Sequence, residues 1–171
     1  MKKFTILLIF IINLLAFSLV AAAEENKTLN GISFDFGCNS ETLIEKYPTI
    51  ADASNVVCAE GQKYYYLVKD IEVFNQKVNM TGFSFKNDKL YQVDFFFENV
   101  NAEAREEILK CISSKAGKPT PIIDRKKGND IFQVCAWVLH NTEFRLGYSK
   151  EDPQDPYEGF LKVTIIDPEN E

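Results

Sequence analysis

The chain has 171 residues, 46% of them hydrophobic, with 25 acidic against 19 basic side chains and a formal net charge of −6. An acidic chain repels phosphate backbones and anionic lipid headgroups, so this composition disfavours a nucleic-acid-binding or membrane-surface protein. The length suits one domain, and no internal repeat or low-complexity tract is evident in the sequence.

The first 23 residues have the pattern of a secretory signal peptide. Two lysines follow the initiating methionine, residues 4–20 are almost entirely apolar, and three alanines occupy positions 21–23. We therefore expect residues 1–23 to be cleaved. Residues 24–171 should then form a single domain that is periplasmic or secreted and does not insert stably into a membrane. An uncleaved membrane anchor is the alternative, since about twenty apolar residues can span a bilayer.

The first elements after the leader are short. Residues 30–36 alternate apolar and polar side chains, which predicts a strand. A short helix follows, capped by Asn39 or Ser40 and stopped by Pro48. Two further strands, rich in valine and tyrosine, are predicted at residues 56–59 and 63–68.

The clearest local signal is a β-hairpin in the middle of the chain. Two runs of aromatic and β-branched residues, 78–85 and 89–98, flank a polar Lys-Asn-Asp turn. Because side chains alternate along a strand, the second run should have a core face and an outer face. The core face is expected to carry Tyr91, Val93, Phe95 and Phe97, and the outer face Gln92, Asp94 and Phe96.

A longer helix and three strands complete the predicted fold. Asn101 has the position of an N-cap, an apolar stripe recurs at three- and four-residue steps, and Gly117 can close the helix. Residues 120–130 are polar and are interpreted as a loop. Strands are predicted at residues 131–139, 143–149 and 160–166. We expect an α+β fold, in which an antiparallel sheet has two helices packed on one face and two disulfides.

Four cysteines follow the leader, and an even number in an exported chain is typical of disulfides. Three pairings are possible, and proximity in sequence favours Cys38–Cys58 and Cys111–Cys135. A zinc site is disfavoured, because the chain has no C-x-x-C motif and a single histidine. A redox role also requires closely spaced cysteines, so all four are expected to be structural.

Several stretches of the chain resemble a group of small exported bacterial proteins. They are "GISFDFGCNSETLIEKYP", a strand and a capped helix; "GFSFKNDKLYQVDFFF", a hairpin; and "KAGKP", which closes a helix before a tryptophan-containing strand. The group has a helix-plus-meander layout and includes the β-lactamase inhibitor protein and outer-membrane assembly lipoproteins. Over residues 31–148 the resemblance implies a protein that binds other proteins without catalysis. The chain lacks the lipoproteins' lipid-attachment cysteine, and its sequence has no two evident similar halves like the inhibitor's, so no binding residue is carried over.

No motif in the sequence indicates catalysis. His140 is the only histidine and falls in a predicted hairpin turn, where exposure to solvent is its ordinary role. Asp152, Asp155 and Glu158 lie in an acidic, proline-containing segment that matches no EF-hand spacing. We therefore expect no catalytic residue, no metal and no cofactor.

Aromatic residues give the best indication of function. Strands with three consecutive tyrosines or phenylalanines must place rings on both faces, and exposed rings among polar groups are typical of protein interfaces. We expect a non-enzymatic protein-binding module of inhibitor, immunity or envelope-assembly type. Its binding face is expected to contain Tyr65, Gln92, Asp94 and Phe96. The alternatives are a small-molecule or glycan carrier with an aromatic-lined pocket and, third, a carboxylate-based hydrolase.

Overall fold

The computed structural model divides the chain into two units, residues 1–34 and residues 35–171. The residues that it describes are 28–29, 32–33, 35–58, 60–127, 130–149 and 159–171. In the first unit, strand β1 (Thr28–Leu29) pairs antiparallel with β2 (Ile32–Ser33). The predicted signal peptide and its cleavage site lie outside the described residues. Of the described residues in the predicted strand 30–36, Ile32–Ser33 are in a strand.

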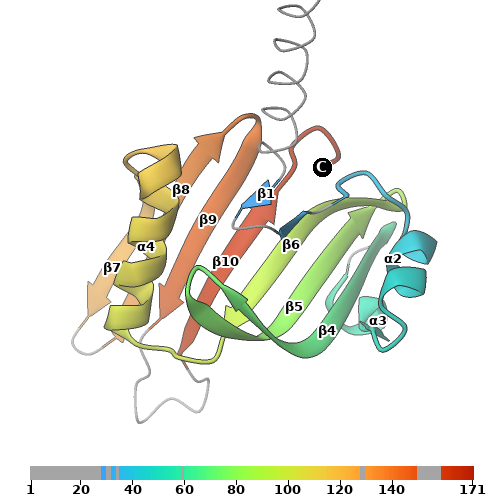
Figure 1. The fold of residues 1–171 in the computed structure, drawn as a ribbon, viewed down its shortest axis with the longest axis horizontal. Helices are drawn as coiled ribbons and strands as arrows, with labels where there is room; N and C mark the ends of the chain where they lie inside the picture. The colour runs from blue at the N-terminus through green and yellow to red at the C-terminus, as the bar shows by residue number, and fades with distance from the viewer. Residues whose placement is uncertain (1–27, 30–31, 34, 59, 128–129, 150–158) are drawn as a thin grey trace, which may run out of the picture. The chain divides into compact units, whose positions relative to one another are not determined.

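The second unit is built on an eight-stranded sheet in which every pair of neighbouring strands is antiparallel (Figure 1). The order across the sheet is β3-β4-β5-β6-β10-β9-β8-β7. The strands are β3 (Ala51–Asp52), β4 (Gln62–Val73), β5 (Gln76–Lys86), β6 (Lys89–Phe97), β7 (Thr120–Lys127), β8 (Asp130–Leu139), β9 (Thr142–Ser149) and β10 (Phe160–Ile166). The helices are α2 (Ser40–Lys46), α3 (Ser54–Val57) and α4 (Ala102–Ala116).

The strand order shows two halves with the same topology. Helix α2 is followed by the meander β3 to β6, and helix α4 is followed by the meander β7 to β10, with α3 as an addition in the first half. The last strands of the meanders, β6 and β10, pair at the centre of the sheet, where Val93 lies opposite Ile165. The fold therefore contains two halves of similar topology, although the sequence shows no two evident ones. The repeat is one of topology and leaves no evident pattern in the sequence.

Local sequence explains where the two longer helices begin and end. Asn39 Oδ1 accepts the N–H of Thr42 at 2.9 Å to start α2, and Asn101 Oδ1 accepts that of Ala104 at 2.8 Å to start α4. Gly117 ends α4 with a φ of +79°, which glycine adopts without strain. Both predicted helices, with their caps, are confirmed.

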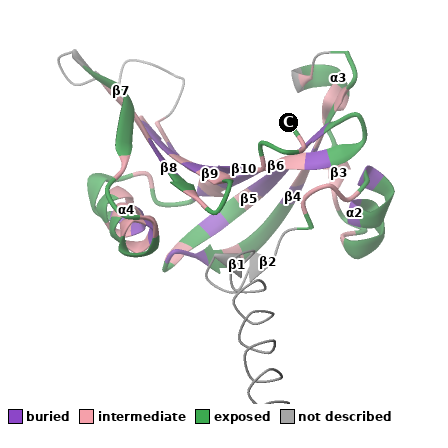
Figure 2. Cartoon of the chain, turned by 90° about the horizontal axis from the view of Figure 1, so that it is seen from above, coloured by how far each residue is buried: buried purple, intermediate pink, exposed green. Residues whose placement is uncertain are grey.

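The hydrophobic core lies between the sheet and the helices α2 and α4, which are on the same side of it (Figure 2). Trp137 Nε1 donates to the carbonyl of Gly117 at 3.0 Å and so ties the end of α4 to β8. The ring of Tyr47, at the end of α2, stacks on Phe83 with 6.0 Å between centroids. One row of buried side chains crosses the sheet on this face: Tyr65, Phe83, Val93, Ile165, Phe144 and Trp137.

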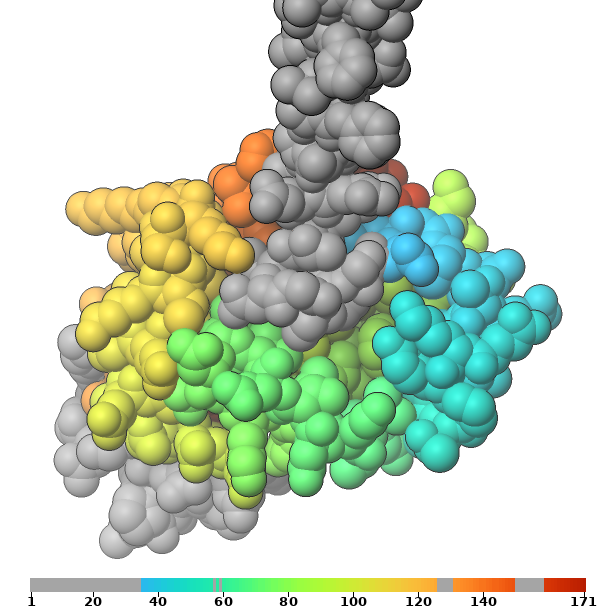
Figure 3. Space-filling view, viewed as in Figure 1, coloured from blue at the N-terminus to red at the C-terminus, as the bar shows by residue number. Residues whose placement is uncertain are grey.

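The turn between β4 and β5 reaches the helix of the other half. Phe74 in this turn is buried, and its ring centroid lies 6.4 Å from that of Phe97. The amide of Gln76 donates to the carboxylate of Glu107 on α4. The space-filling view shows the turn in contact with the helix (Figure 3). The first half therefore helps to bury α4, which couples the two halves on the core side.

The structure corrects the predicted fold class. An eight-stranded antiparallel sheet with a few short helices dominates the fold in place of the expected α+β arrangement, and all four cysteines are free thiols. Residues 120–130, expected to be a loop, contain the edge strand β7, in which Asp124 lies opposite Gln133. Polar and charged sequences are typical of sheet edges as well as of loops, so composition alone did not distinguish the two.

The prediction of a Cys38–Cys58 disulfide is wrong. Both cysteines are free thiols, and their side chains have different neighbours. Cys38 lies near Asp88 in the β5–β6 turn and near the end of α2 at Lys46. Cys58 follows α3 and lies near Asp52 at the edge of the sheet. Proximity in sequence did not bring these thiols together in the fold.

The second predicted disulfide, Cys111–Cys135, is also wrong. The Cys111 sulfur on α4 lies 4.0 Å from the side-chain nitrogen of Asn75, in the β4–β5 turn. Cys135 on β8 lies instead near Arg105, almost two helical turns closer to the start of α4. Burial raises the pKa of the Cys135 thiol, which keeps it protonated and unreactive.

Candidate functional site

The sheet face that α2 and α4 leave uncovered carries three of the four predicted site residues. Gln92, Asp94 and Phe96 lie on this face, as the alternation along β6 predicts. Tyr65 does not: it is 7% exposed, and its ring packs edge-on against Phe85 in the core, with 5.7 Å between centroids. The expectation that Tyr65 points outward is wrong, because a run of three tyrosines gives no local signal of which ring faces inward.

Strand register identifies the residues that share this face. Tyr64 lies opposite Ser84, which in turn lies opposite Gln92, so Tyr64 takes the place expected for Tyr65. A second row crosses the sheet from Gly82 through Asp94, Thr164 and Arg145. We call this surface the open face and define it by Tyr64, Gly82, Gln92, Asp94, Phe96, Phe132, Glu143, Arg145, Gly147, Phe160, Lys162 and Thr164.

A buried carboxylate lies at the centre of the open face, where the two halves meet. Asp94 is 3% exposed. The Thr164 hydroxyl donates to its Oδ1 at 2.6 Å, the Gln92 amide donates to Oδ2 at 2.9 Å, and Lys162 Nζ lies 3.2 Å from Oδ1. A buried charge is unfavourable unless it is paired and hydrogen-bonded, and three donors from β6 and β10 satisfy this one. The cluster joins the halves and leaves no exposed negative charge at the centre.

Two glycines allow aromatic rings to lie against the sheet on either side of this cluster. The side chain of Tyr64 crosses onto Gly82, where a Cβ would overlap its hydroxyl group. A Cβ at Gly147 would lie 3.1 Å from the ring of Phe160. Burial, followed by the charge of Asp94, raises the pKa of Tyr64 to about 12, so its phenol stays neutral at physiological pH. No sequence signal distinguished Tyr64 from its two neighbouring tyrosines.

Cations are held over the rings of the open face. Lys162 Nζ lies 5.5 Å from the centroid of Phe96, and the guanidinium of Arg125, on β7, lies 5.5 Å from that of Phe132. Phe132 and Phe160 pack edge to face with 5.9 Å between centroids. The three phenylalanines are neither fully buried nor fully exposed. Such contacts fix the cationic side chains while leaving their charges accessible.

A bidentate ion pair completes the open face on β9. Arg145 donates from Nε and from a terminal nitrogen to the two carboxylate oxygens of Glu143, at 2.7 and 2.8 Å. These hydrogen bonds raise the pKa of Arg145. Planar two-point pairs of this kind hold the guanidinium in one orientation, so Arg145 is pre-positioned.

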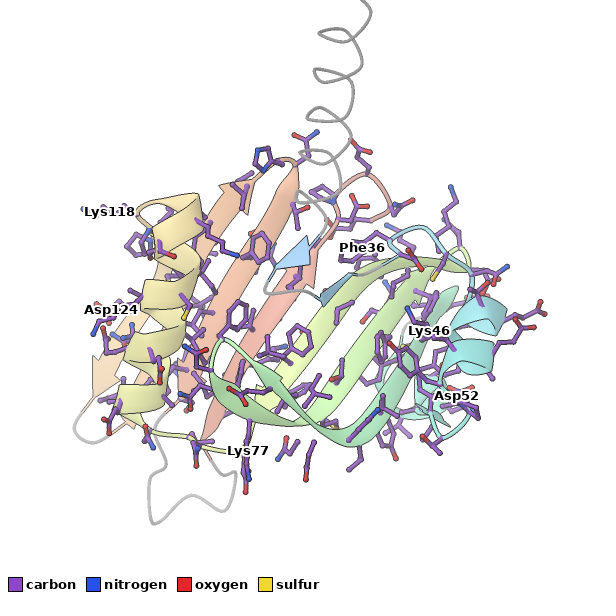
Figure 4. The ribbon with its side chains drawn as sticks, in the orientation of Figure 1. Phe36, Lys46, Asp52, Lys77, Lys118 and Asp124 are labelled. Carbon is purple, nitrogen blue, oxygen red and sulfur yellow. The ribbon has the colours of Figure 1, made fainter. Side chains whose placement is uncertain are left out.

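Both edges of the sheet carry features that disfavour the addition of another strand. On β7, Pro121 lacks an N–H donor, the register shifts between Pro121 and Ile123, and charged residues follow. On β4, the register shifts between Val68 and Ile71. Asp124 lies on the edge strand β7, and Asp52 lies on the opposite edge strand β3 (Figure 4). Neither edge is therefore well suited to pair with a further strand.

A cluster of Ser40, Lys63 and Asp88 contains residue types found in hydrolases, but its geometry is structural. The Ser40 hydroxyl donates to Asp88 at 2.6 Å, and Lys63 Nζ donates to both Asp88 and Ser40. Hydrogen bonds from Lys63 and Ser40 lower the pKa of Asp88, and the bond to Asp88 raises the pKa of Lys63. Neither group is then a useful base, and Ser40 is buried. The cluster ties α2 to the β5–β6 turn.

The remaining sequence candidates add no site. His140 lies in the β8–β9 turn with a φ of +49°, as the predicted turn requires. Asp152, Asp155 and Glu158 lie outside the described residues. Among the residues that the structure describes, no group of three or more histidine, cysteine or acidic side chains is placed to hold a metal ion. Within the same ranges, no helix has the length and apolar character needed to span a bilayer.

The fold and the open face define a curved antiparallel-sheet protein with one helix-covered face and one polar, aromatic face. Comparison with protein-family models, curated proteins and solved structures finds no match to this chain. The resemblance to small exported bacterial binding proteins therefore stays a prediction.

Proposed function

We propose that the protein is an exported, non-enzymatic module that binds another protein through the open face. The observation that carries this proposal is a set of part-exposed aromatic rings beside ordered polar side chains, on a face that α2 and α4 leave uncovered. Rings and cations that are already fixed lose little side-chain entropy on binding, which is why such residues dominate interface energies. The protein would then be an inhibitor, an immunity protein or an envelope-assembly accessory.

The construction of the open face supports binding rather than catalysis. Asp94 has its oxygens occupied by Thr164, Gln92 and Lys162, so it is not poised to accept a proton from a substrate. The residues of the face stand on central strands, which hold side chains more rigidly than loops do. A rigid, preformed surface of this kind is suited to docking a folded partner.

Affinity capture tests the proposed face. Residues 24–171 are used as bait against the envelope and secreted fraction of the source cells, together with two variants. Phe96→Ser removes a ring from the open face, and Ile44→Ser makes the same kind of change at an exposed position on α2. We expect the parent chain and Ile44→Ser to capture the same protein and Phe96→Ser to lose it. Undiminished capture by a Phe96→Ser variant with parental circular dichroism would exclude the open face.

Export is tested separately. The intact mass of the protein recovered from its source cells should correspond to a chain that begins at Glu24, and the protein should appear in the periplasmic or secreted fraction. Recovery of the uncleaved chain from the membrane fraction would instead support the anchor alternative.

A further inference from the structure

We infer that residues 167–171, which follow β10, form a strap that covers one end of the open face and must lift before a partner can occupy that end. This inference rests on the proposed function and adds a means of regulating the same surface. Figure 2 shows the C-terminal residue, marked C, on the side of the sheet opposite to α2 and α4. The strap therefore turns toward the open face after β10 ends at Ile166.

The strap crosses from the second half of the sheet to the first. The N–H of Asp167 donates to the carbonyl of Tyr91, near the start of β6, at 2.8 Å. The side chain of Asn170 lies against Gly37, just before α2, where a Cβ would be 3.3 Å from its amide nitrogen. The strap thus spans the end of the sheet at which β6 begins and β10 ends.

The burial of Ile166 indicates that this end of the open face is covered. Strand register places Ile166 in one row with Gln92 and Glu143, two residues of the open face. The preceding residue, Ile165, belongs to the buried row on the core side, so Ile166 points to the opposite side. Ile166 is nevertheless only 2% exposed. An isoleucine on an uncovered sheet face is buried only where another part of the chain lies over it.

The last residue of the strap, Glu171, lies near two side chains at this end of the open face. Tyr91 lies beside Ser84, which is in the same row as Gln92. Burial raises the pKa of the Tyr91 phenol, and the charge of Glu171 raises it further. The pKa of Arg145 is raised first by its hydrogen bonds to Glu143 and then by the same Glu171 charge. The strap is therefore the part of the chain placed to cover Ile166.

The strap keeps its shape through hydrogen bonds within itself. The Asp167 carboxylate accepts the N–H of Glu169 at 3.1 Å and the side-chain amide of Asn170 at 2.9 Å. The N–H of Asn170 also donates to the carbonyl of Asp167 at 3.2 Å. An aspartate that accepts from the residues after it in this way stabilises a turn. The strap can therefore move as one unit.

The attachment of the strap beyond Asp167 is weak. The side-chain nitrogen of Asn141, in the β8–β9 turn, lies 3.5 Å from the Glu169 carboxylate, which is longer than an ordinary hydrogen bond. Glu169 and Glu171 are exposed, so water screens their charges. Lifting residues 168–171 breaks no pairing of β10, because that strand ends at Ile166. Segments held in this way open locally while the rest of the domain stays folded.

Lifting the strap would enlarge the open face. It uncovers the side chain of Ile166 and the ring of Tyr91, and it removes the Glu171 charge from Arg145. Tyrosine and arginine are among the residues that contribute most to protein interfaces. A partner that uses this end binds only the fraction of molecules whose strap is lifted, so the closed strap lowers its apparent affinity.

The solvent exposure of Ile166 tests the cover directly. Isoleucine-methyl-labelled chains of residues 24–171 and 24–167 are compared by nuclear magnetic resonance, with an uncharged gadolinium chelate as the probe. We expect the relaxation enhancement of the Ile166 methyl signals to rise severalfold when the strap is removed. Ile165 is the internal control: it lies in the core, so its enhancement should stay at the parental value if the truncated chain is folded.

Point variants make the same test with a chain of full length. Asn170→Ala removes the side chain that lies on Gly37, so it should also raise the enhancement at Ile166. Asn99→Ala makes the same change at an exposed position beyond the other end of β6 and should have no effect. Tyr91→Ala distinguishes the strap from the tyrosine ring. Exposure of Ile166 in Tyr91→Ala, with none in the truncated chain, would overturn the inference.

Affinity capture then tests the regulation. At equal, sub-saturating amounts of bait, the truncated chain and Asn170→Ala should retain about threefold to tenfold more of the captured protein than the parent, because the competent fraction rises. Asn99→Ala should match the parent. Equal or weaker capture by the truncated chain, or an unchanged Ile166 signal, would overturn the inference and leave the proposed function standing. Absence of capture by every form, with Ile166 uncovered as expected, would instead remove the proposed function and the regulation that rests on it.

Discussion

The side chain of Tyr64 on β4 lies over Gly82 of β5, so a larger residue at position 82 requires Tyr64 to move or to change. Gly82→Ala should lower the free energy of unfolding by about 1–3 kcal/mol, because the added methyl group would overlap the Tyr64 hydroxyl. Urea denaturation followed by far-ultraviolet circular dichroism measures the change. Adding Tyr64→Ala should recover part of the loss by removing the overlap. Parental stability of Gly82→Ala would show that the ring does not need this glycine.

Trp137 joins the end of α4 to the sheet through its indole nitrogen. Trp137→Phe should lower the free energy of unfolding by about 1–2 kcal/mol, because the carbonyl of Gly117 loses its donor. The comparison uses circular dichroism, since Trp137 is the only tryptophan and its fluorescence disappears with it. Ser113→Ala is the control: its hydroxyl is 3.3 Å from the same nitrogen and should matter less. A larger loss of stability from Ser113→Ala than from Trp137→Phe would contradict the expectation that the bond to the Gly117 carbonyl is the important one.

The Asp88–Lys63 pair predicts a pH-dependent stability. Hydrogen bonds from Lys63 and Ser40 lower the pKa of Asp88, so its contribution is present above its ordinary pKa and is lost as the pH falls through the lowered value. Lys63 has a raised pKa, so its contribution persists at neutral pH and is lost only in strong alkali. Asp88→Asn should therefore be less stable than the parent at neutral pH and equal to it in strong acid.

The Asp88→Asn effect should be at most about 1 kcal/mol, because both side chains of the pair are about half exposed and water screens them. Asparagine tolerates the positive φ of +60° at this position, so the backbone adds no strain of its own. Urea titrations at neutral and acidic pH make the measurement. A stability difference that persists in strong acid would contradict the ionic explanation.

Free thiols give a direct chemical test of the fold. Iodoacetamide in denaturant without reductant should label all four cysteines, since none is disulfide-bonded in the structure. In the native state labelling should be slower, because burial raises the pKa of the Cys38 and Cys135 thiols and thiolate is the reactive form. Mass spectrometry counts the adducts. Two or four missing adducts would show that disulfides form after all.

The sequence by itself determined the elements whose signals are local. Asn101 and Gly117 set the ends of α4, because a side-chain cap and a positive φ depend on a few adjacent residues. The β5–β6 and β8–β9 turns were predicted in the same way, and the alternation along β6 placed Gln92, Asp94 and Phe96 on one face. These features need no knowledge of distant parts of the chain.

Only the tertiary structure decided which residues meet. Asp94 and Lys162 are far apart in sequence and come together because β6 pairs with β10, the last strands of two topologically similar halves. The register of β4 on β5 likewise places Tyr65, and not Tyr64, in the row of buried side chains. The cysteines that are close in sequence also remain free thiols in the fold. Such contacts depend on strand order, which no local pattern specifies.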